Sequence, residues 1–373
     1  MPHCVHSPRS NPAISWLSSV NQHSNPTISH LGLRLVDPNG MIEKGTANAL
    51  VPSARVWAGA AYGCMERYRM DRLQQAWEVR AARFPREIVF ARPSSTIAIS
   101  VTGQQCALDC AHCGRHYLAG MRPMPHALDI VRERHPKSVL LSGGCDLSGR
   151  VPLGDWPRRV AESAPGVRIN CHAGLVSEAE AEEIAQWADA VSFDVTTDQR
   201  VISQVYGLRR SPEEYIASYV SLAKRVPTVP HVCIGLAGPP ESLSSSSAPP
   251  EIGALKAILE TATGGEAPMP PAIVFIVFTP TPRTRMASVP APEPELVRDI
   301  IAEARLMFPD TLINLGCMRP GGTYRGLVDA MAIDAGANLI VQPAPEAVEH
   351  ARALGLAIVE TDECCALLRG GSA

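Results

Sequence analysis

The chain has 373 residues, a formal net charge of −3 and 46% hydrophobic residues. These values indicate a globular protein with a sizeable core and give no basic field for nucleic acid or an anionic membrane. The longest apolar run, Ala272–Phe278, is far shorter than the roughly 20 residues that span a bilayer. The N-terminus does not have the pattern of a secretory signal. We therefore expect a cytoplasmic protein that binds neither nucleic acid nor membranes.

The first part of the chain is expected to be a disordered extension followed by a helix. Residues 1–45 are rich in Ser, Pro, Asn and His and show no regular period. Such a composition buries too little apolar surface to offset the entropy of ordering. Residues 46–94 are expected to lead into the core through a helix at Met65–Phe84.

From Thr96 onward, short apolar runs alternate with amphipathic stretches, which predicts parallel strands joined by helical crossovers. Eight units fit a closed (β/α)8 barrel of the TIM type over residues 95–343. Residues 344–373 then hold the last helix and a cysteine-containing tail. The alternative is an incomplete barrel with the last two units packed as an appendage. The expected strands are Thr96–Val101, Ser138–Ser142, Val167–Cys171, Ala190–Val195, Val229–Leu236, Ala272–Phe278, Thr311–Leu315 and Asn338–Gln342.

Three cysteines follow the first predicted strand in the spacing Cys106-x3-Cys110-x2-Cys113. Three thiolates on one loop can bind three irons of a [4Fe–4S] cluster and leave the fourth iron open. S-adenosylmethionine (SAM) can chelate an open iron, and the reduced cluster can cleave it to a 5′-deoxyadenosyl radical. A zinc site completed by His112 and His116 is the alternative. The position of the loop after a barrel strand, at the catalytic end, favours the cluster.

Polar residues at other strand ends are further candidates. The second predicted strand runs into a glycine-rich turn, and glycines let backbone groups approach a ligand closely. Asn170 and His172 flank the exit of the third strand, where we expect cofactor binding. Asp194 ends the fourth strand and needs a partner, either the ribose or amine of SAM or an arginine such as Arg319 or Arg325. Arg319 could also bind a carboxylate of SAM or substrate through two hydrogen bonds.

Several phrases of the sequence are similar to a known family. From Phe84 to Leu368 the chain resembles the biotin synthase branch of the radical SAM superfamily, and most closely the two-component, archaeal-type lipoyl synthases. The phrases are ISVTGQQCALDCAHCGRHYLAGM, LLSGGCDLSGRVPL, VYGL, GCMRPGG and ECCAL. The resemblance implies a radical SAM barrel with an N-terminal extension and a C-terminal tail. It also implies that Ser142, Gly143 and Gly144 flank the SAM methionine and that His112 packs against the adenine.

The resemblance to lipoyl synthases implies sulfur insertion into a protein-bound octanoyl chain, with a second, auxiliary iron–sulfur cluster as the sulfur source. The candidate ligands of that cluster follow strands or lie on a tail that could fold over the barrel mouth. Cys171 and Cys233, inside apolar strands, are as consistent with core residues as with ligands. The candidate ligands are Cys145, Cys317, Cys364 and Cys365.

The partners implied by the resemblance are a substrate carried on a lipoyl domain or acyl carrier protein, a ferredoxin or flavodoxin as electron donor, and a sister radical SAM subunit. Two other functions stay open at this point. One is a radical SAM enzyme of another cofactor or small-molecule pathway, and the other is a non-catalytic metal-binding barrel.

Overall fold

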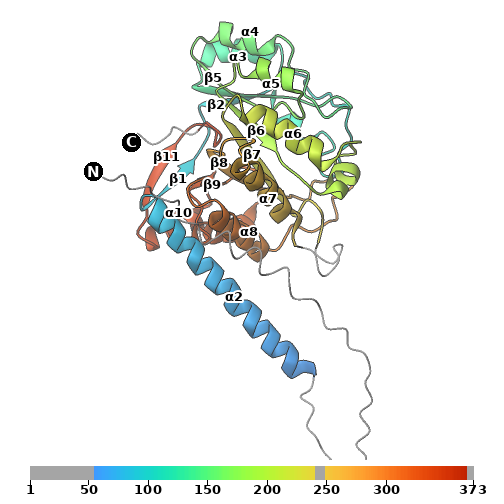
Figure 1. Cartoon of the computed structure of the whole chain (residues 1–373). Helices are drawn as coiled ribbons and strands as arrows, with labels where there is room; N and C mark the ends of the chain where they lie inside the picture. Colours follow the sequence, from blue (N-terminus) through green and yellow to red (C-terminus); the bar gives the residue numbers. More distant parts are fainter. Residues whose placement is uncertain (1–53, 240–247, 368–373) are drawn as a thin grey trace, which may run out of the picture. The chain divides into compact units, whose positions relative to one another are not determined.

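The computed structural model describes residues 54–239 and 248–367, with side chains from residue 69 onward (Figure 1). The expected extension at residues 1–45 lies outside the described residues. Every predicted strand is present, with ends that lie within two residues of the prediction. Within the described part of the chain, no helix is long and apolar enough to cross a membrane.

The elements follow one another in the alternating order that the sequence predicts. The helices are α2 (Ala54–Arg83), α3 (His126–Arg134), α4 (Trp156–Ser163), α5 (Glu178–Ile184), α6 (Pro212–Ala223), α7 (Pro250–Thr263), α8 (Pro294–Met307), α9 (Gly322–Asp334) and α10 (Pro345–Ala353), with the short helical turns η2 (His116–Gly120) and η3 (Val201–Val205). The strands are β1 (Glu87–Ala91), β2 (Thr96–Ser100), β3 (Arg122–Pro123), β4 (Ser138–Ser142), β5 (Arg168–Cys171), β6 (Ala190–Asp194), β7 (Thr228–Ile234), β8 (Ala272–Val277), β9 (Leu312–Leu315), β10 (Leu339–Val341) and β11 (Ala357–Thr361).

All the strands lie in one parallel sheet with the order β11-β1-β10-β9-β8-β7-β6-β5-β4-β2-β3. The prediction of a closed eight-stranded barrel needs correction, because β10 pairs with β1 and not with β2. Two strands that the sequence analysis missed, β1 and β11, extend the sheet on this side. The alternative is right that the barrel is incomplete, but its last two predicted strands, β9 and β10, belong to the sheet and are not an appendage. The result is a curled, TIM-like parallel barrel that stays open between its two edge strands.

The two faces of the sheet bury different layers. Outward-facing Phe193, Phe275 and Ile313 belong to a large core that includes helix residues such as Ile258 of α7 and Ile301 of α8. In Figure 1, α6, α7 and α8 run alongside strands β6 to β9. The inward-facing residues form a separate apolar group around the barrel interior, which includes Val229, Val274, Leu339 and Cys365. Because side chains alternate along each strand, one face of the sheet packs against the helices and the other lines the barrel interior.

The segment after β11 crosses to the strand starts at the amino end of the barrel. Ser95 donates its backbone N–H to Asp362 O (2.9 Å), and Lys137 pairs with the Asp362 carboxylate (2.7 Å). Cys364 donates its N–H to Thr96 Oγ1 (3.0 Å), at the first residue of β2. The expectation that this tail folds over the mouth of the barrel is therefore wrong, because it lies at the opposite end from the CxxxCxxC loop.

Candidate functional site

The CxxxCxxC loop leaves the carboxyl end of β2 and is held by three other segments. Ala107 donates its N–H to Cys145 O (2.8 Å), directly after β4, and Ala111 donates to Val205 O (2.6 Å) in η3. Met286 in turn donates its N–H to Ala111 O (3.1 Å). The backbone between the cysteines is thus fixed by contacts from distant parts of the chain.

The three loop thiols lie within one another's electrostatic field. Burial raises the pKa of Cys110 to about 12, and the neighbouring Cys113 and Cys106 act in the same direction. Burial also raises the pKa of Cys113, again with a contribution from Cys106. Such crowded thiols are poor thiolates by themselves, and a bound cationic centre would deprotonate them. This donor set fits the [4Fe–4S] cluster that the spacing predicts.

No three His, Cys, Asp or Glu side chains in residues 69–239 and 248–367 converge closely enough to hold a single metal ion. The ligands of a cubane cluster each bind a different iron, so they need not meet at one point. The spread of Cys106, Cys110 and Cys113 around the loop is compatible with that arrangement.

His112 is a buried ring with an unpartnered polar atom. Its Nδ1 has no hydrogen-bond partner among the described residues. Burial lowers the pKa of His112 to about 4, so the ring is neutral near pH 7. The ring meets Tyr206 edge-on, with centroids 5.6 Å apart. A neutral aromatic ring with a free polar atom suits both packing and hydrogen bonding to a nucleobase.

The glycine-rich exit of β4 packs directly against the cysteine loop. A Cβ on Gly144 would lie 2.0 Å from Gln105 O and 2.6 Å from Cys106 Cβ, so only glycine fits there. Gly144 donates its N–H to Thr102 Oγ1 (2.8 Å), and Cys145 donates its N–H to Cys106 Sγ (3.2 Å). The close approach of β4 therefore shapes the loop and supplies a donor to one of its thiols.

Ser142 and Gly143 lie on the same exit as Gly144. Ser142 donates its hydroxyl to His172 O (3.1 Å), which ties β4 to the end of β5. A Cβ on Gly143 would come within 3.1 Å of the Thr102 and Val101 side chains. The predicted contact of these residues with the methionine part of SAM stays a prediction.

Asp194 and His172 form an ion pair in an open space at the carboxyl ends of β6 and β5. His172 Nε2 lies 3.3 Å from Asp194 Oδ2, and the two side chains are 34% and 43% exposed. Burial alone would raise the pKa of Asp194, but His172, His231 and His112 lower it to about 2. Burial opposes charge on His172, but Asp194 outweighs it and raises the His172 pKa. Asp194 is thus an ionised carboxylate whose partner is a histidine, not the predicted Arg319 or Arg325.

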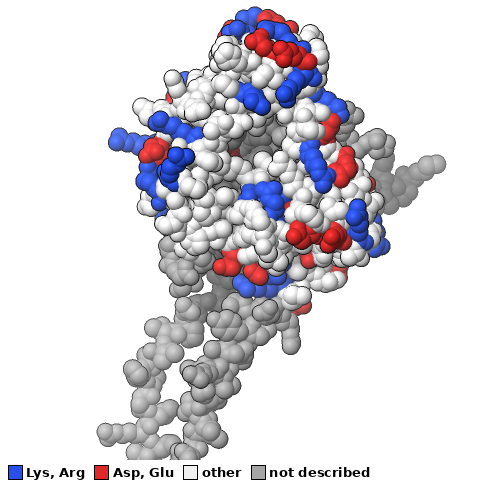
Figure 2. Space-filling view, turned by 180° about the vertical axis from the view of Figure 1, so that it is seen from behind, with Lys and Arg blue, Asp and Glu red and all other residues white. Residues whose placement is uncertain are grey.

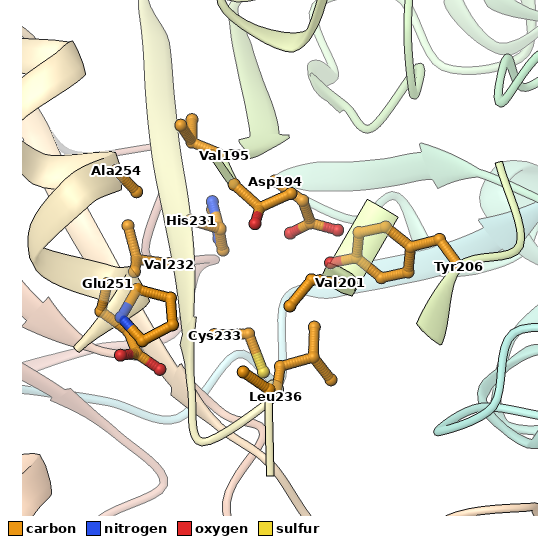
Figure 3. Close-up of a pocket in the computed structure, with 13 residues that line it drawn as sticks. Asp194, Val195, Val201, Tyr206, His231, Val232, Cys233, Leu236, Glu251 and Ala254 are labelled. Atoms are coloured by element: carbon orange, nitrogen blue, oxygen red, sulfur yellow. The ribbon is translucent and has the colours of Figure 1, made fainter. Parts of the chain in front are cut away.

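A pocket opens beside Asp194, between the exits of β6 and β7 and the start of α7 (Figure 3). Asp194, Tyr206, His231 and Cys233 supply its polar atoms on the barrel side. His231 Nδ1 lies 3.0 Å from Val229 O, so it must donate, which leaves Nε2 as an acceptor. Burial lowers the pKa of His231 to about 4, so this ring is neutral near pH 7. Cys233 thus lines the pocket, at one of the positions where the sequence left core and ligand roles open.

Sequence reasoning missed several pocket residues. His231 stands two residues before Cys233 in β7, and this spacing places both side chains on one face of the strand. Glu251 enters the pocket from α7, where its Oε1 accepts the backbone N–H of Gly235 (2.8 Å). A histidine inside an otherwise apolar strand was the available signal for His231. Nothing in the sequence pattern pointed to Glu251.

Arg319 does not face the pocket. Its guanidinium makes a two-point ion pair with Asp329 (2.6 and 2.9 Å), and both side chains are fully buried. It also donates to Gly316 O (2.6 Å) and Gln342 O (3.3 Å). The prediction of a catalytic or carboxylate-binding Arg319 is therefore wrong, because its donors already hold the β9–α9–β10 corner together.

The cysteines proposed as auxiliary ligands fall into two groups. Cys145 lies beside the cluster loop, where burial, followed by Cys106 and Cys110, raises its pKa to about 12. Cys317 instead lies in the field of Cys364, towards the barrel interior. The predicted set of Cys145 with Cys317 and the tail is therefore not assembled in one place.

Two further candidate residues, Cys171 and Asn170, lie on opposite faces of β5. Cys171 is fully buried on the outward face of β5, within the helix-covered core, as one of the two open interpretations held. Asn170, on the inward face, donates to Cys364 Sγ (3.4 Å) and to Ser192 Oγ (3.0 Å). Asn170 thus meets the tail and not the pocket beside Asp194.

The surface carries no strong field of one sign on the face shown in Figure 2, where basic and acidic side chains are interspersed. Among the described residues, charged side chains often form exposed pairs, such as Arg150 with Asp146 (3.2 Å) and Arg210 with Glu214 (2.7 Å). This distribution agrees with the small net charge of the chain.

No protein-family model and no curated protein matches the chain. Among solved structures, it is similar to methylornithine synthase (PylB), with 15% identity over 78% of this chain and 89% of that one and a TM-score of 0.53. It is also similar to HydG, a maturase of the FeFe-hydrogenase, with 13% identity over 78% and 68% and a TM-score of 0.54. A weaker likeness, with a TM-score of 0.37, is to coproporphyrinogen III oxidase (HemN) from Escherichia coli, a radical SAM enzyme, with 14% identity over 63% and 55%. The chain therefore shares the parallel barrel fold of methylornithine synthase and HydG.

Proposed function

We propose that this protein is a radical SAM enzyme that binds a [4Fe–4S] cluster through Cys106, Cys110 and Cys113 and reductively cleaves SAM. The observation that carries the proposal is the grouping of these thiols beside a polar pocket. Cys110 Sγ lies 3.6 Å from the carbonyl of Tyr206, which lines that pocket. The fold shared with methylornithine synthase and HydG supports the proposal.

The residues around the thiols suit SAM. When bound, the cluster supplies the electron that cleaves the sulfonium to methionine and a 5′-deoxyadenosyl radical. His112 offers a neutral ring and a free Nδ1 to the adenine. Asp194, ionised and partly exposed, accepts hydrogen bonds from the ribose hydroxyls or the amine. The backbone N–H of Cys145 donates to Cys106 Sγ (3.2 Å), one of the three sulfurs that would hold the cluster.

Cluster binding and SAM binding can be tested by spectroscopy. The full-length protein is reconstituted anaerobically, and its absorption and reduced electron paramagnetic resonance spectra are recorded with and without SAM. We expect a [4Fe–4S] signal that SAM perturbs. Replacing all three loop cysteines with Ala should remove the signal, whereas Cys171→Ala, at a buried outward cysteine, should retain it. A triple variant that keeps a SAM-responsive cluster would refute the assignment of the ligands.

Within this class, the finer proposal is sulfur insertion into an octanoyl chain, as in the lipoyl synthases that the sequence resembles. The inward faces of β8 and β10 are apolar, with Val274, Leu339 and Val341 in one group with Cys365. An apolar wall next to thiols suits an acyl chain that is to receive sulfur. A lipoyl domain or acyl carrier protein would present the chain, and ferredoxin or flavodoxin would supply electrons.

This finer proposal has its own assay. An octanoylated lipoyl-domain peptide is incubated with the reconstituted protein, SAM and reductant, with and without a candidate sister radical SAM protein. Mass spectrometry should detect thiolated octanoyl products. SAM cleavage without thiolation under both conditions would remove sulfur insertion and leave a radical SAM enzyme with another substrate.

A further inference from the structure

The tail after β11 forms the floor of the barrel interior. The N–H of Cys364 donates to Thr96 Oγ1 (3.0 Å), and Arg168 at the start of β5 forms an ion pair with the buried Glu363. Cys365 packs into the apolar group of inward-facing strand residues. These contacts fix the adjacent residues Cys364 and Cys365 at the amino end of the barrel, opposite the CxxxCxxC loop.

The Cys364 thiol is surrounded by hydrogen-bond donors. Asn170 Nδ2 donates to its Sγ (3.4 Å). The neighbouring Cys365 thiol and the Ala366 backbone N–H act together with Asn170 to lower the pKa of Cys364. Donors of this kind favour a thiolate. Cys364 is partly accessible and Cys365 is buried, so Cys364 is the member of the pair that can react.

Two groups at the strand exits lie close enough to influence Cys364. Cys317, which follows β9 and is exposed, lies in the electrostatic field of Cys364. His172, held by Asp194 at 3.3 Å, lies in the same field. Cys364 is therefore close to groups at the strand exits, and its partial exposure means that it is not sealed in the apolar floor.

A second observation points to a missing ligand near this floor. Asn314 is fully buried, and neither amide atom, Nδ2 or Oδ1, has a hydrogen-bond partner among the described residues. It faces inward on β9, because its neighbours Ile313 and Leu315 belong to the outward core. In register it lies between Val274 of β8 and Leu339 of β10, which pack with Cys365. A buried amide without partners is costly unless a ligand atom completes it.

We infer that Cys364 carries a sulfane sulfur atom, as a persulfide, inside the barrel. The inference rests on the proposed sulfur insertion, which needs a sulfur atom near the substrate. The predicted auxiliary ligands do not assemble, because Cys145 lies with the cluster loop and Cys317 lies with the tail. The donors around Cys364 suit the anionic persulfide, and the Asn314 amide lies in the layer where its outer sulfur would need a partner.

The loading step balances without an external oxidant. The Cys364 thiolate attacks the outer sulfur of a low-molecular-weight persulfide, RSSH. A new S–S bond forms to Cys364, the S–S bond of RSSH breaks, and RS⁻ leaves, so one sulfur atom moves with no net redox change.

The transfer step also balances. A carbon radical on the substrate attacks the outer sulfur of the anionic persulfide, which forms a C–S bond and gives a substrate thiolate that takes up a proton from solvent. The S–S bond breaks homolytically and leaves a thiyl radical on Cys364. One electron from a ferredoxin- or flavodoxin-type donor then restores the thiolate.

The test uses glutathione persulfide as the probe and does not require the cluster to turn over. The full-length protein is incubated anaerobically with the probe, alkylated, digested and analysed by mass spectrometry. Wild type should show one extra sulfur atom on Cys364. Cys364→Ser should lose it, Cys365→Ser should retain it with slower loading, and the matched control Cys171→Ser should behave as wild type. Thermal unfolding of each variant verifies folding.

Two results would overturn the inference. One is an unmodified Cys364 in folded wild-type protein, and the other is modification spread over Cys317 and the loop cysteines to the same extent. Formation of 5′-deoxyadenosine by wild type is measured in parallel. Its absence, with Cys364 persulfidated, would count against the proposed SAM chemistry and not against the sulfur site.

Discussion

The two ends of this barrel hold thiols in opposite electrostatic settings. At the carboxyl end, burial and mutual repulsion raise the pKa values of Cys110 and Cys113. At the amino end, hydrogen bonds led by the Cys365 thiol lower the pKa of Cys364. The chain itself stabilises the Cys364 anion at the floor, whereas Cys110 and Cys113 need a positive partner to ionise.

This difference indicates two separate tasks for cysteines in one fold. The loop is built to be completed by a cationic cofactor, and its backbone is fixed by β4, η3 and the segment after β8. The tail is built to present a nucleophile, and it is fixed by ion pairs and hydrogen bonds to the strand starts. The following changes act on one end at a time.

The largest expected effect is on iron content, and it distinguishes Cys110, a proposed cluster ligand, from its neighbour Cys145. Cys110→Ala should lose one cluster's worth of iron and all SAM cleavage, because two thiolates cannot replace three. Cys145→Ala should keep the cluster, because this residue contributes its backbone N–H to Cys106 Sγ. Iron and sulfide analysis of both variants provides the measurement. Equal loss in both would mean that Cys145 is a ligand.

The buried Arg319–Asp329 pair should matter for stability and not for either group of thiols. Asp329→Ala leaves an uncompensated buried charge, which should lower the free energy of unfolding by about 3–5 kcal/mol. Denaturant unfolding of the variant and wild type tests this value. A stable variant with weakened SAM binding would instead restore the predicted role of Arg319 in binding a carboxylate.

Gly144 tests how tightly β4 shapes the loop. Gly144→Ala places a Cβ within 2.0 Å of Gln105 O, and overpacking of this kind costs about 1–3 kcal/mol. We expect lower thermal stability together with reduced cluster occupancy, because the loop must move. Gly321→Ala, where a Cβ would meet nothing within 4 Å and the φ is −89°, is the matched control. Equal effects at both positions would mean that the contact with the cysteine loop is not the cause.

The His172–Asp194 pair predicts a pH dependence. His172 has a raised pKa in the folded protein, so its charge stabilises the fold fully below pH 6.5, the ordinary pKa of histidine. This contribution is lost as the pH rises through the raised pKa. The ionised Asp194 carboxylate stabilises the fold above pH 3.8, and this contribution is lost as the pH falls through about 2. The stability advantage of wild type over Asp194→Asn should therefore shrink from pH 6 towards pH 9. Urea unfolding across that range tests it, and a constant difference would contradict the pairing.

The smallest expected effect is at the floor. Asn170→Ala removes one of several donors to Cys364 Sγ, so the pKa of this thiol should rise modestly. Alkylation of Cys364 by iodoacetamide near neutral pH should slow several-fold, with the cluster unchanged. The rate–pH profile of the Cys364-containing peptide, followed by mass spectrometry, measures the shift. An unchanged profile would mean that Asn170 does not stabilise the thiolate.

The fold could be predicted largely because its strands are buried on both faces. Continuous apolar runs such as Ala272–Val277 are unambiguous when helices separate them. Strand β11 was missed because Ala357–Thr361 is an edge strand whose side chains are all partly or fully exposed. Strand β1, Glu87–Ala91, was assigned to the helical lead-in because its pairing with β10 is set by tertiary structure. The closure of the barrel depends on these two strands.

The site residues also differ in whether their roles depend on neighbours in the sequence or on distant partners. The loop cysteines are close in sequence, so their spacing alone predicts their grouping. The roles of Arg319 and of the tail depend on partners that no local pattern reveals, such as Asp329 and Thr96. His231 was overlooked because one histidine in an apolar strand is a weak signal until the neighbouring Asp194 is known.

The most direct test of the central claim is the formation of 5′-deoxyadenosine. Reconstituted protein is reduced with dithionite in the presence of SAM, and the products are quantified by liquid chromatography and mass spectrometry. We predict 5′-deoxyadenosine and methionine from wild type, and neither above background from the variant in which Cys106, Cys110 and Cys113 are replaced by Ala. Equal product from both proteins would contradict the assignment of this loop as the site of radical generation.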